Sequence, residues 1–336
     1  MVDSKQQWKA WLYLSPAIVL LLVFTVWPII NTVIMAFTEG YTALGSIGEQ
    51  TFQFGIGNFT KVMFKFPDFK ECLINTMLLC FATVPLSTFL ALLIAVCLNS
   101  IKPLQRLLQT IFFLPYVTNS IAVGMVFAAM FNIVGTFLGS ESQLVTSPGI
   151  INYFIELTGL GNLIEWLLEN HPNTISWLTT TYPISWINDG STYMANMIVV
   201  IVYIVWNALP FKILILLGGL QSVNKQYYEA AKVDGTSRTR VFTNITIPLL
   251  SPMLAYVIIT GFIGGFKEYS SIVGIFGETM GPPHDPYRLN TMVGLIYKEL
   301  PNNQYGRVAA AALILFAIIF VVTMINLGVS KKKVHY

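Results

Sequence analysis

The chain has 336 residues, of which 55% are hydrophobic and only 10% are charged. Soluble domains carry about 25% charged residues, so this composition excludes an ordinary soluble domain and predicts a membrane protein. The formal net charge of +3 is too small to indicate a nucleic-acid partner. Cys72, Cys80 and Cys97 have no spacing typical of a disulfide framework, and we expect each to pack as a small apolar side chain.

Three long apolar runs occupy the first part of the chain, at residues 12–37, 74–99 and 108–131. A helix that crosses the bilayer needs about 20 predominantly apolar residues, so each run predicts one membrane span. The first run is too long for a signal peptide and no small-residue cleavage site follows it, so we expect it to be retained. Residues 38–73 predict an external loop, and Lys102 to Arg106 form a short basic connection before the third run.

The largest interruption is the segment 132–193, which has no lysine or arginine but five acidic residues, Glu141, Glu156, Glu165, Glu169 and Asp189. Apolar residues recur at helical spacing over 150–169 and predict a helix there. Tryptophan is enriched where a membrane meets water, so we expect Trp166, Trp177 and Trp186 to lie at that interface. The segment is therefore predicted to be an external insertion.

Three further apolar runs, at 194–217, 249–276 and 308–329, bring the predicted number of spans to six. Lysine and arginine favour the cytoplasmic side of a membrane. With both termini placed on one side, that side holds 11 Lys and Arg residues and the opposite loops hold six. We therefore predict that both termini, and the loop between the fourth and fifth spans, face the cytoplasm.

This loop is basic, and over residues 221–252 it reads QSVNKQYYEAAKVDGTSRTRVFTNITIPLLSP. Ser222 can cap a first short helix, because its hydroxyl can accept a hydrogen bond from an unpaired N–H group. Asp234-Gly235 is expected to end that helix, because glycine accepts the left-handed conformation that follows a helix. The first half of the loop is therefore predicted to be a short, sharply terminated helix.

A second short helix is predicted in the other half of the loop. Thr236 or Ser237 can cap it. Pro248 lacks a backbone N–H and marks the expected break before the fifth span. Two short helices held against a membrane predict a surface that docks on another protein.

The loop also carries a specific motif. Glu229-Ala230-Ala231 is followed at fixed spacing by Asp234-Gly235 and then by Phe242, Ile245, Pro248 and Pro252. This pattern resembles the EAA loop of permease subunits in bacterial ABC importers. Thr236 stands where that family usually has alanine, and Ile247 where leucine is common; neither departure changes the turn chemistry.

Shorter stretches elsewhere resemble the sugar-importing branch of the family, and are most similar to the first of two permeases in oligosaccharide importers related to the maltose transporter. These stretches are Asn75-Thr76, Phe113-Leu114-Pro115, Leu220-Gln221-Ser222, Phe266-Lys267-Glu268-Tyr269 and Tyr305-Gly306. The resemblance implies an all-α polytopic protein with the six-helix fold of type I ABC importer permeases. It also implies that the loop couples to a cytoplasmic ATPase through Glu229, Ala230, Ala231, Asp234, Gly235, Phe242 and Pro248.

The partners that the resemblance implies lie in and around a bacterial cytoplasmic membrane. They are a second homologous permease, two ATPase subunits that hold ATP and Mg, an external solute-binding protein, membrane lipid and a carbohydrate, most simply an oligosaccharide. No GxxxxGK[ST] motif occurs in the chain, so no ATP site is expected on it. The sequence has neither paired catalytic carboxylates nor a GxSxG motif, so it gives little support for an enzyme. His171, His284 and His335 are too widely separated to suggest a metal site.

This interpretation divides the chain into three segments. Residues 1–73 comprise the N-terminal cytoplasmic segment, the first span and an external loop. Residues 74–276 form the core permease domain, with the external insertion at 132–193 and the coupling loop at 221–248. Residues 277–336 contain an external loop, the last span and a cytoplasmic tail.

Polar residues within the predicted spans are candidates for a translocation pathway: Tyr116, Asn119, Asn207, Lys267, Glu268, Tyr269 and Ser270. A sugar needs hydrogen-bonding side chains and an aromatic face, and this set supplies both. An ionisable group at a helix centre costs about 2.5–3.5 kcal/mol to insert, so Lys267 and Glu268 need partners or water. Lys267 and Glu268 can contact the pathway or form a structural pair between subunits. For Asn119 and Asn207 taken singly, hydrogen bonding between helices is slightly favoured over a role in the pathway.

Five other residues carry structural expectations. Lys212 is expected to extend its amine to the cytoplasmic surface from the end of the fourth span. Gly261 and Gly265 have the spacing that permits close helix packing. Pro115 and Pro210 are expected to bend the third and fourth spans.

Other classes of protein remain as alternatives. An ion-driven secondary transporter would show inverted repeats and discontinuous helices with ion ligands, and neither is clear in the sequence. An intramembrane enzyme would need a catalytic pair at depth. Within the importer class, the solute could also be a glycerol phosphate or a lipid-linked molecule.

Overall fold

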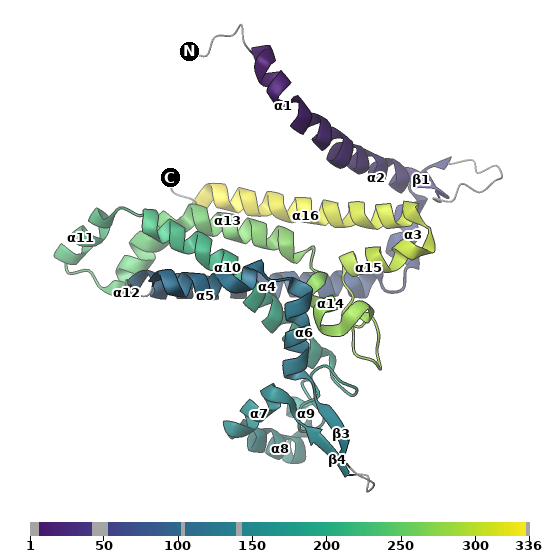
Figure 1. The fold of residues 1–336 in the computed structure, drawn as a ribbon, viewed down its shortest axis with the longest axis vertical. Helices are drawn as coiled ribbons and strands as arrows, with labels where there is room; N and C mark the ends of the chain where they lie inside the picture. Colours follow the sequence, from purple (N-terminus) through teal and green to yellow (C-terminus); the bar gives the residue numbers. More distant parts are fainter. Residues whose placement is uncertain (1–6, 42–52, 102–104, 139–142, 334–336) are drawn as a thin grey trace. The chain divides into compact units, whose positions relative to one another are not determined.

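The computed structural model describes residues 7–41, 53–101, 105–138 and 143–333, and it is helical nearly throughout (Figure 1). The basic connection at 102–104 lies outside these residues. The chain divides into two compact units, one of Met1–Lys70 with Leu295–Ile318 and the other of Glu71–Gly294 with Ile319–Tyr336. Some helices therefore run from one unit into the other.

The elements up to the first long connection are α1 (Gln7–Leu21), a π-helical turn (Leu22–Val26), α2 (Trp27–Phe37), β1 (Thr38–Glu39), β2 (Gln53–Phe54) and α3 (Gly57–Lys65). The next group is α4 (Phe69–Ser100), α5 (Gln105–Val117), α6 (Ser120–Phe131), β3 (Val134–Leu138), β4 (Gln143–Ser147), α7 (Gly149–Leu157), α8 (Leu160–Asn170) and α9 (Pro172–Ile175). The last group is α10 (Tyr193–Ser222), α11 (Lys225–Val233), α12 (Arg238–Val241), a π-helical turn (Phe242–Thr246), α13 (Ile247–Gly265), α14 (Ser270–Phe276), α15 (Met292–Glu299) and α16 (Tyr305–Lys333).

Six membrane spans are present among the described residues when one bent pair of helices is counted as a span. Five continuous helical segments are long and apolar enough to cross a membrane: Trp8–Phe37, Phe69–Ser100, Tyr193–Ser222, Arg238–Gly265 and Tyr305–Lys331. The sixth is the pair Leu107–Val117 and Ser120–Phe131, which bends by 99°. In the part of the chain that the structure describes, the strands form two short antiparallel hairpins, so the predicted all-α membrane fold is confirmed.

The third predicted span is sharply broken instead of merely bent. Helix α5 ends two residues after Pro115, and α6 leaves in a different direction (Figure 1). Asn119 caps α6, with its Oδ1 accepting from the N–H groups of Ile121 at 2.9 Å and Ala122 at 3.4 Å. Helix α10, in contrast, runs as one helix through Pro210.

The fifth predicted span is also shorter than 249–276. Helix α13 ends at Gly265, residues 266–269 leave the helix, and α14 begins at Ser270. Lys267 and Glu268 therefore lie at a helix break and not inside a continuous span, which is the correction to the sequence prediction. The break removes the need to carry two ionisable side chains through a continuous apolar helix.

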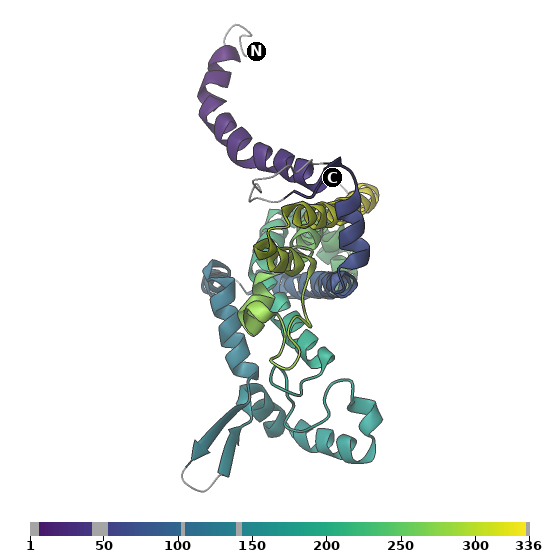
Figure 2. The same ribbon diagram turned by 90° about the vertical axis from the view of Figure 1, so that its right-hand side faces the viewer.

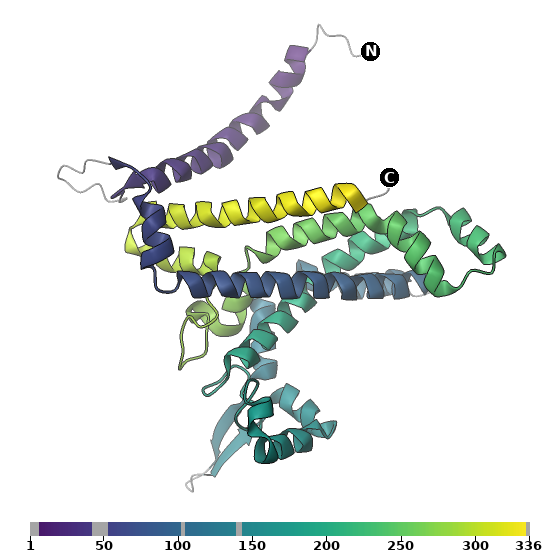
Figure 3. The ribbon, with the colours of Figure 1, turned by 180° about the vertical axis from the view of Figure 1, so that it is seen from behind.

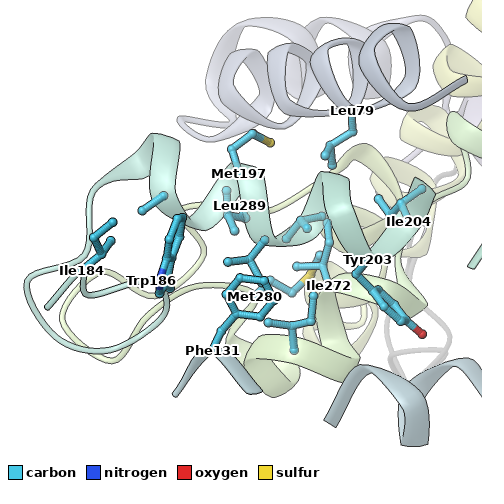
Figure 4. Close-up of a cluster of buried hydrophobic side chains, with 14 residues drawn as sticks. Leu79, Phe131, Ile184, Trp186, Met197, Tyr203, Ile204, Ile272, Met280 and Leu289 are labelled. Atoms are coloured by element: carbon cyan, nitrogen blue, oxygen red, sulfur yellow. The ribbon is translucent and has the colours of Figure 1, made fainter. Parts of the chain in front are cut away.

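The larger unit has a core that joins the loop before α10 to the helices α6, α10 and α14. Figure 4 shows Ile184 and Trp186 from the loop at one end of this cluster and Tyr203 of α10 at the other end. Trp186 is only 7% exposed, and its Nε1 donates to Asn152 Oδ1 at 3.2 Å. The prediction that Trp186 lies at the membrane interface is therefore wrong, while Trp166 and Trp177 are exposed by 51% and 56%.

Two short helices, α7 and α8, stand where the sequence predicts one helix over residues 150–169. Gly159 adopts φ +76 between α7 and α8, a conformation that ends a helix and favours glycine. The hairpin of β3 and β4 and the helices α7 to α9 lie beyond the end of α6 (Figure 2). Gly159 therefore separates α7 from α8, and the apolar periodicity of the sequence alone does not reveal this interruption.

The GxxxG spacing in α13 gives the close packing that it predicts. A Cβ atom at Gly261 would lie 3.1 Å from Val84 Cγ1, and one at Gly265 would lie 2.9 Å from Cys80 Sγ. Both contacts are with α4, so the two glycines let α13 approach that helix closely. Van der Waals packing of this kind stabilises helix pairs in membranes, where the hydrophobic effect between helices is absent.

The smaller unit depends on Gly306 at the start of α16. A Cβ atom there would lie 2.7 Å from Asn58 Nδ2 and 3.1 Å from the carbonyl oxygen of Thr38. Asn58 cannot move away freely, because its Nδ2 donates to the carbonyl oxygens of Ala36 at 3.1 Å and Thr38 at 2.9 Å. Gly306 is thus the residue that allows α16 to begin against α2 and α3.

Gly306→Ala is therefore expected to destabilise the protein by about 1–3 kcal/mol, the usual cost of overpacking a close contact. Thermal unfolding of the purified protein in detergent measures the effect. Gly328→Ala is the matched control in the same helix, because no atom lies within 4 Å of a Cβ placed there. Equal unfolding temperatures for the two variants would contradict this account of Gly306.

Candidate functional site

The loop between α10 and α13 begins with a helix whose cap differs from the predicted one. Ser222 is the last residue of α10 and does not cap α11. Asn224 does so, with its Oδ1 accepting from the N–H of Gln226 at 3.0 Å. Asparagine and serine are about equally good helix caps, so the continuation of α10 to Ser222 decides between them.

The end of α11 has the predicted glycine turn. Gly235 adopts φ +64. The N–H of Thr236 donates to the carbonyl oxygen of Ala231 at 3.0 Å, and the N–H of Gly235 donates to that of Lys232 at 3.2 Å. This pair of bonds is the Schellman pattern, which satisfies the last carbonyl groups of a helix and reverses the chain. The turn fixes the direction in which α12 leaves α11.

The second half of the loop differs from the prediction at Pro248. Ser237 occupies the residue before α12, but its side chain makes no capping hydrogen bond, contrary to the prediction. The helical segment from Arg238 to Gly265 continues through Pro248 without a break. A π-helical turn at Phe242–Thr246 comes directly before the proline, which lies in the first turn of α13. The missing N–H of a proline is tolerated at the first turn of a helix, so Pro248 does not end the helical segment.

Helices α11 and α12 lie at one end of α10 and α13 (Figure 3), and α11 has an exposed face that no other described element covers. Glu229, Ala230, Asp234 and Gly235 are exposed, and so are two large apolar side chains, Tyr227 at 54% and Val233 at 88%. Ala231 is buried and Phe242 is partly buried, so these two motif residues pack inward. An exposed apolar pair beside acidic side chains is typical of a surface that a partner covers.

The base of this face is attached to the fifth span. The hydroxyl oxygens of Tyr228 and Thr246 lie 3.3 Å apart and share a hydrogen bond. Thr246 is buried in the π-helical turn that leads into α13. A force on α11 can therefore reach the span through a short, directly bonded connection.

A second candidate site is a cavity of about 290 Å³ between α4, α5, α10 and α13. It is lined by three of the predicted pathway residues, Tyr116, Asn207 and Glu268, together with polar residues that the sequence analysis did not select. Tyr116 stacks on Phe211 with ring centroids 5.7 Å apart, which places an aromatic platform at the cavity wall. The cavity thus combines an aromatic face, an amide and a carboxylate.

Lys212 lines the same cavity and does not extend to the surface, so the prediction for this residue is wrong. It is only 4% exposed. Its Nζ donates to three acceptors of α4: Ser87 Oγ at 2.7 Å, Thr88 Oγ1 at 2.9 Å and the carbonyl oxygen of Val84 at 3.2 Å. An ammonium group has three donors, and these acceptors satisfy all of them. Complete satisfaction is what makes the burial of this charge tolerable.

The signal for this arrangement is present in the sequence. Thr83, Ser87 and Thr88 are spaced so that they share one face of a helix, within a run that is otherwise apolar. A polar stripe on one apolar helix and a lone lysine in another predict a buried pair only when the two helices are known to be neighbours. The sequence does not specify which helices lie next to each other.

Glu268 has a local structural role in addition to lining the cavity. Its Oε1 accepts from the N–H of Ser271 at 3.1 Å, in the first turn of α14. Its own carbonyl oxygen accepts from Thr291 Oγ1 at 2.9 Å. Glu268 therefore stabilises the first turn of α14 after the break, and its carbonyl oxygen links the break to Thr291, the residue before α15.

The two roles of Glu268 can be separated by substitution. Glu268→Gln keeps an oxygen acceptor for Ser271, whereas Glu268→Ala removes it and is expected to cost about 1 kcal/mol, as the loss of a helix cap does. We expect the unfolding temperature to fall for alanine and to stay near that of the wild type for glutamine. If glutamine destabilises as much as alanine, the negative charge, and not the cap, is what the fold requires.

The remaining predicted pathway residues are not brought to the cavity. Asn119 is exposed and caps α6, and Lys267 in the helix break and Ser270 at the start of α14 are also exposed. Tyr269 packs against the core of the larger unit. Three of the seven predicted residues thus meet at one cavity, and four lie elsewhere.

Comparison with known proteins places this geometry in a family. Residues 84–334 match the model of the binding-protein-dependent transport system inner membrane component. That match covers most of the chain, including the loop and the cavity. The chain belongs to this family.

The similarity to individual relatives extends over nearly the whole chain. This chain is 28% identical to an arabinooligosaccharides transport system permease protein of Bacillus subtilis, over 95% of this chain and 88% of that one. It is 26% identical to a lactose transport system permease protein of Rhizobium radiobacter, over 91% of this chain and 89% of that one.

A solved structure shares the fold. A chain in the crystal structure of a bacterial ABC transporter involved in the import of the acidic polysaccharide alginate superimposes with a TM-score of 0.71. The two are 19% identical, and the match covers 98% of this chain and 97% of the other. The predicted fold of an ABC importer permease is confirmed, and this inner membrane component is a transport subunit and not an enzyme.

Proposed function

We propose that this chain is the permease subunit of an ATP-driven, binding-protein-dependent importer for a carbohydrate, most simply an oligosaccharide. It forms half of the translocation pathway and pairs with a second, homologous permease. Two cytoplasmic ATPase subunits bind ATP and Mg and act on the loop between α10 and α13. An external binding protein delivers the solute to the loops on the other side of the membrane.

The observation that carries this proposal is the unpaired face of the loop. Glu229, Ala230 and Asp234 are exposed together with Tyr227 and Val233. The Schellman turn at Gly235 and the hydrogen bond between Tyr228 and Thr246 hold this face in one orientation. A rigid, exposed patch that leads directly into a span is suited to pass movement from an ATPase into the membrane.

The cavity supports a carbohydrate as the solute. Sugars offer hydroxyl groups to polar side chains and an apolar ring face to aromatic side chains. Tyr116 with Phe211 supplies the aromatic platform, and Asn207 and Glu268 supply hydrogen-bonding groups. The named relatives that transport arabinooligosaccharides and lactose support the same class of solute.

The orientation follows from the charge distribution. Both termini and the coupling loop face the cytoplasm of a bacterial cell, because that side holds the larger share of Lys and Arg. In the transport cycle, ATP binding draws the two coupling loops of the permease pair together and opens the cavity outward. Hydrolysis then returns the cavity to the inward side.

Purification from the native membrane tests the coupling role. The wild-type chain should bring a second permease and an ATPase with it, and Glu229→Lys should lose the ATPase while keeping the second permease. Lys225→Gln is the matched control, because it changes an exposed charge in the same helix outside the motif. A wild-type chain that purifies alone and transports under an ion gradient would overturn the proposal.

A further inference from the structure

A separate cavity of about 210 Å³ lies in the smaller unit, between the residues that follow β1, helix α3 and the start of α16. Its lining includes Tyr41, Lys61, Gln304 and Arg307. Neither the coupling loop nor the cavity between α4 and α10 contributes to it. Nothing in the proposed transport cycle uses this second, cation-lined cavity.

The cavity carries positive charge without a matching acid. Lys61 and Arg307 are both partly buried, and neither makes an ion pair with another described residue. Among the described residues, none that lines the cavity is acidic, and Glu39 only adjoins the lining residue Gly40 in the sequence. The Glu39 Oε1 accepts from the N–H of Gly57 at 2.7 Å, and Glu39 makes no ion pair with Lys61 or Arg307. Two partly buried cations that line one cavity, without an ion-pair partner among the described residues, indicate a site for an anion.

The cavity also contains an acceptor that needs a donor. Gln304 Oε1 is buried and has no hydrogen-bond partner among the described residues. Asn58, another lining residue, does not supply one, because its Nδ2 donates to the carbonyl oxygens of Ala36 and Thr38. A buried acceptor without a partner costs about 1–3 kcal/mol, so a ligand that donates here gains affinity. The ligand should therefore combine an anionic group with a hydroxyl or an ammonium group.

The position along the helices narrows the ligand further. The first span ends at Phe37 and the last begins at Tyr305, so the cavity lies at the depth where a span meets the membrane surface. Ile30 and Ile34 on α2 are exposed by 46% and 52%, which leaves an apolar wall along the span below this level. On the proposed orientation, with both termini cytoplasmic, this end of the first and last spans lies at the external membrane surface, so the headgroups of the outer leaflet lie at the depth of the cavity.

We propose that this cavity binds the headgroup of a phospholipid. The phosphate lies between Lys61 and Arg307, and a hydroxyl or ammonium group of the headgroup donates to Gln304 Oε1. The acyl chains lie along the apolar surface of α2. The site holds the ends of the first and last spans together at the membrane surface, and it does not depend on which solute the protein transports.

Titration of the purified protein in a neutral detergent tests the proposal. The probes are dihexanoyl phosphatidylglycerol, dihexanoyl phosphatidylmethanol, which lacks a headgroup donor, and inorganic phosphate. Phosphatidylglycerol should bind best, and the double variant Lys61→Gln with Arg307→Gln should bind it about 30-fold more weakly. Lys65→Gln is the matched control, because Lys65 is an exposed lysine at the end of the same helix.

A second variant tests the proposal independently if the double variant is unstable. Gln304→Leu should bind the two lipids with equal affinity, because it removes the acceptor for the headgroup donor and leaves both cations. Undiminished binding of phosphatidylglycerol in the double variant would overturn the proposal. Inorganic phosphate that binds as tightly as the lipid would assign the site to free phosphate instead of a membrane lipid.

Discussion

Gly235→Pro is expected to remove the ATPase from the purified importer, with a loss of tenfold or more in the recovered ATPase. Proline holds φ near −65°, whereas Gly235 requires φ +64. Proline also lacks the N–H that Gly235 donates to the carbonyl oxygen of Lys232 at 3.2 Å. The turn between α11 and α12 would be lost at a cost of about 3 kcal/mol or more, and the exposed motif residues would no longer share one face.

Gly235→Asn is the matched control for this experiment. Asparagine tolerates the left-handed conformation better than other side chains do, and no atom lies within 4 Å of a Cβ atom at this position. We therefore expect the asparagine variant to retain most of the ATPase. Quantification of the co-purified ATPase against the second permease measures both variants, and full retention in the proline variant would show that the turn does not hold the docking face.

Ser87→Ala combined with Thr88→Val is expected to destabilise the protein by about 3 kcal/mol. The two hydroxyl groups accept from Lys212 Nζ at 2.7 Å and 2.9 Å, and their removal leaves the buried ammonium with only the carbonyl oxygen of Val84. A hydrogen bond to a charged group contributes about 1.5–3 kcal/mol, and the loss of both acceptors leaves two donors of the buried ammonium unsatisfied. Thermal or denaturant unfolding in detergent measures the loss.

The same argument predicts a rescue. Adding Lys212→Met to the double variant removes the stranded charge, and the unfolding free energy should return to within about 1 kcal/mol of the wild type. Thr260→Val is the control, because Thr260 lines the same cavity but its hydroxyl donates only within its own helix, to the carbonyl oxygens of Tyr256 and Val257. If methionine does not rescue, the loss comes from packing around α4 and not from the buried ammonium.

The sequence by itself determined the features that depend on length, composition and local turn chemistry. Apolar runs of sufficient length identified the six spans, because a helix must satisfy its own backbone in lipid. The glycine of Asp234-Gly235 determined the turn of the coupling loop, because its φ +64 is a local property of that residue. The spacing of Gly261 and Gly265 likewise predicted a close helix contact before its partner, α4, was known.

The tertiary structure alone decided features that depend on which helices are neighbours. Lys212 is buried because α4 offers three acceptors at its position, and no property of the α10 sequence specifies them. Trp186 is buried because α7 supplies the Asn152 acceptor for its indole. The cavity takes Tyr116, Asn207 and Glu268 from three separate helical regions and excludes Lys267, which precedes Glu268 directly. Polarity in a sequence shows that a side chain needs a partner, whereas the packing of the helices decides which partner it finds.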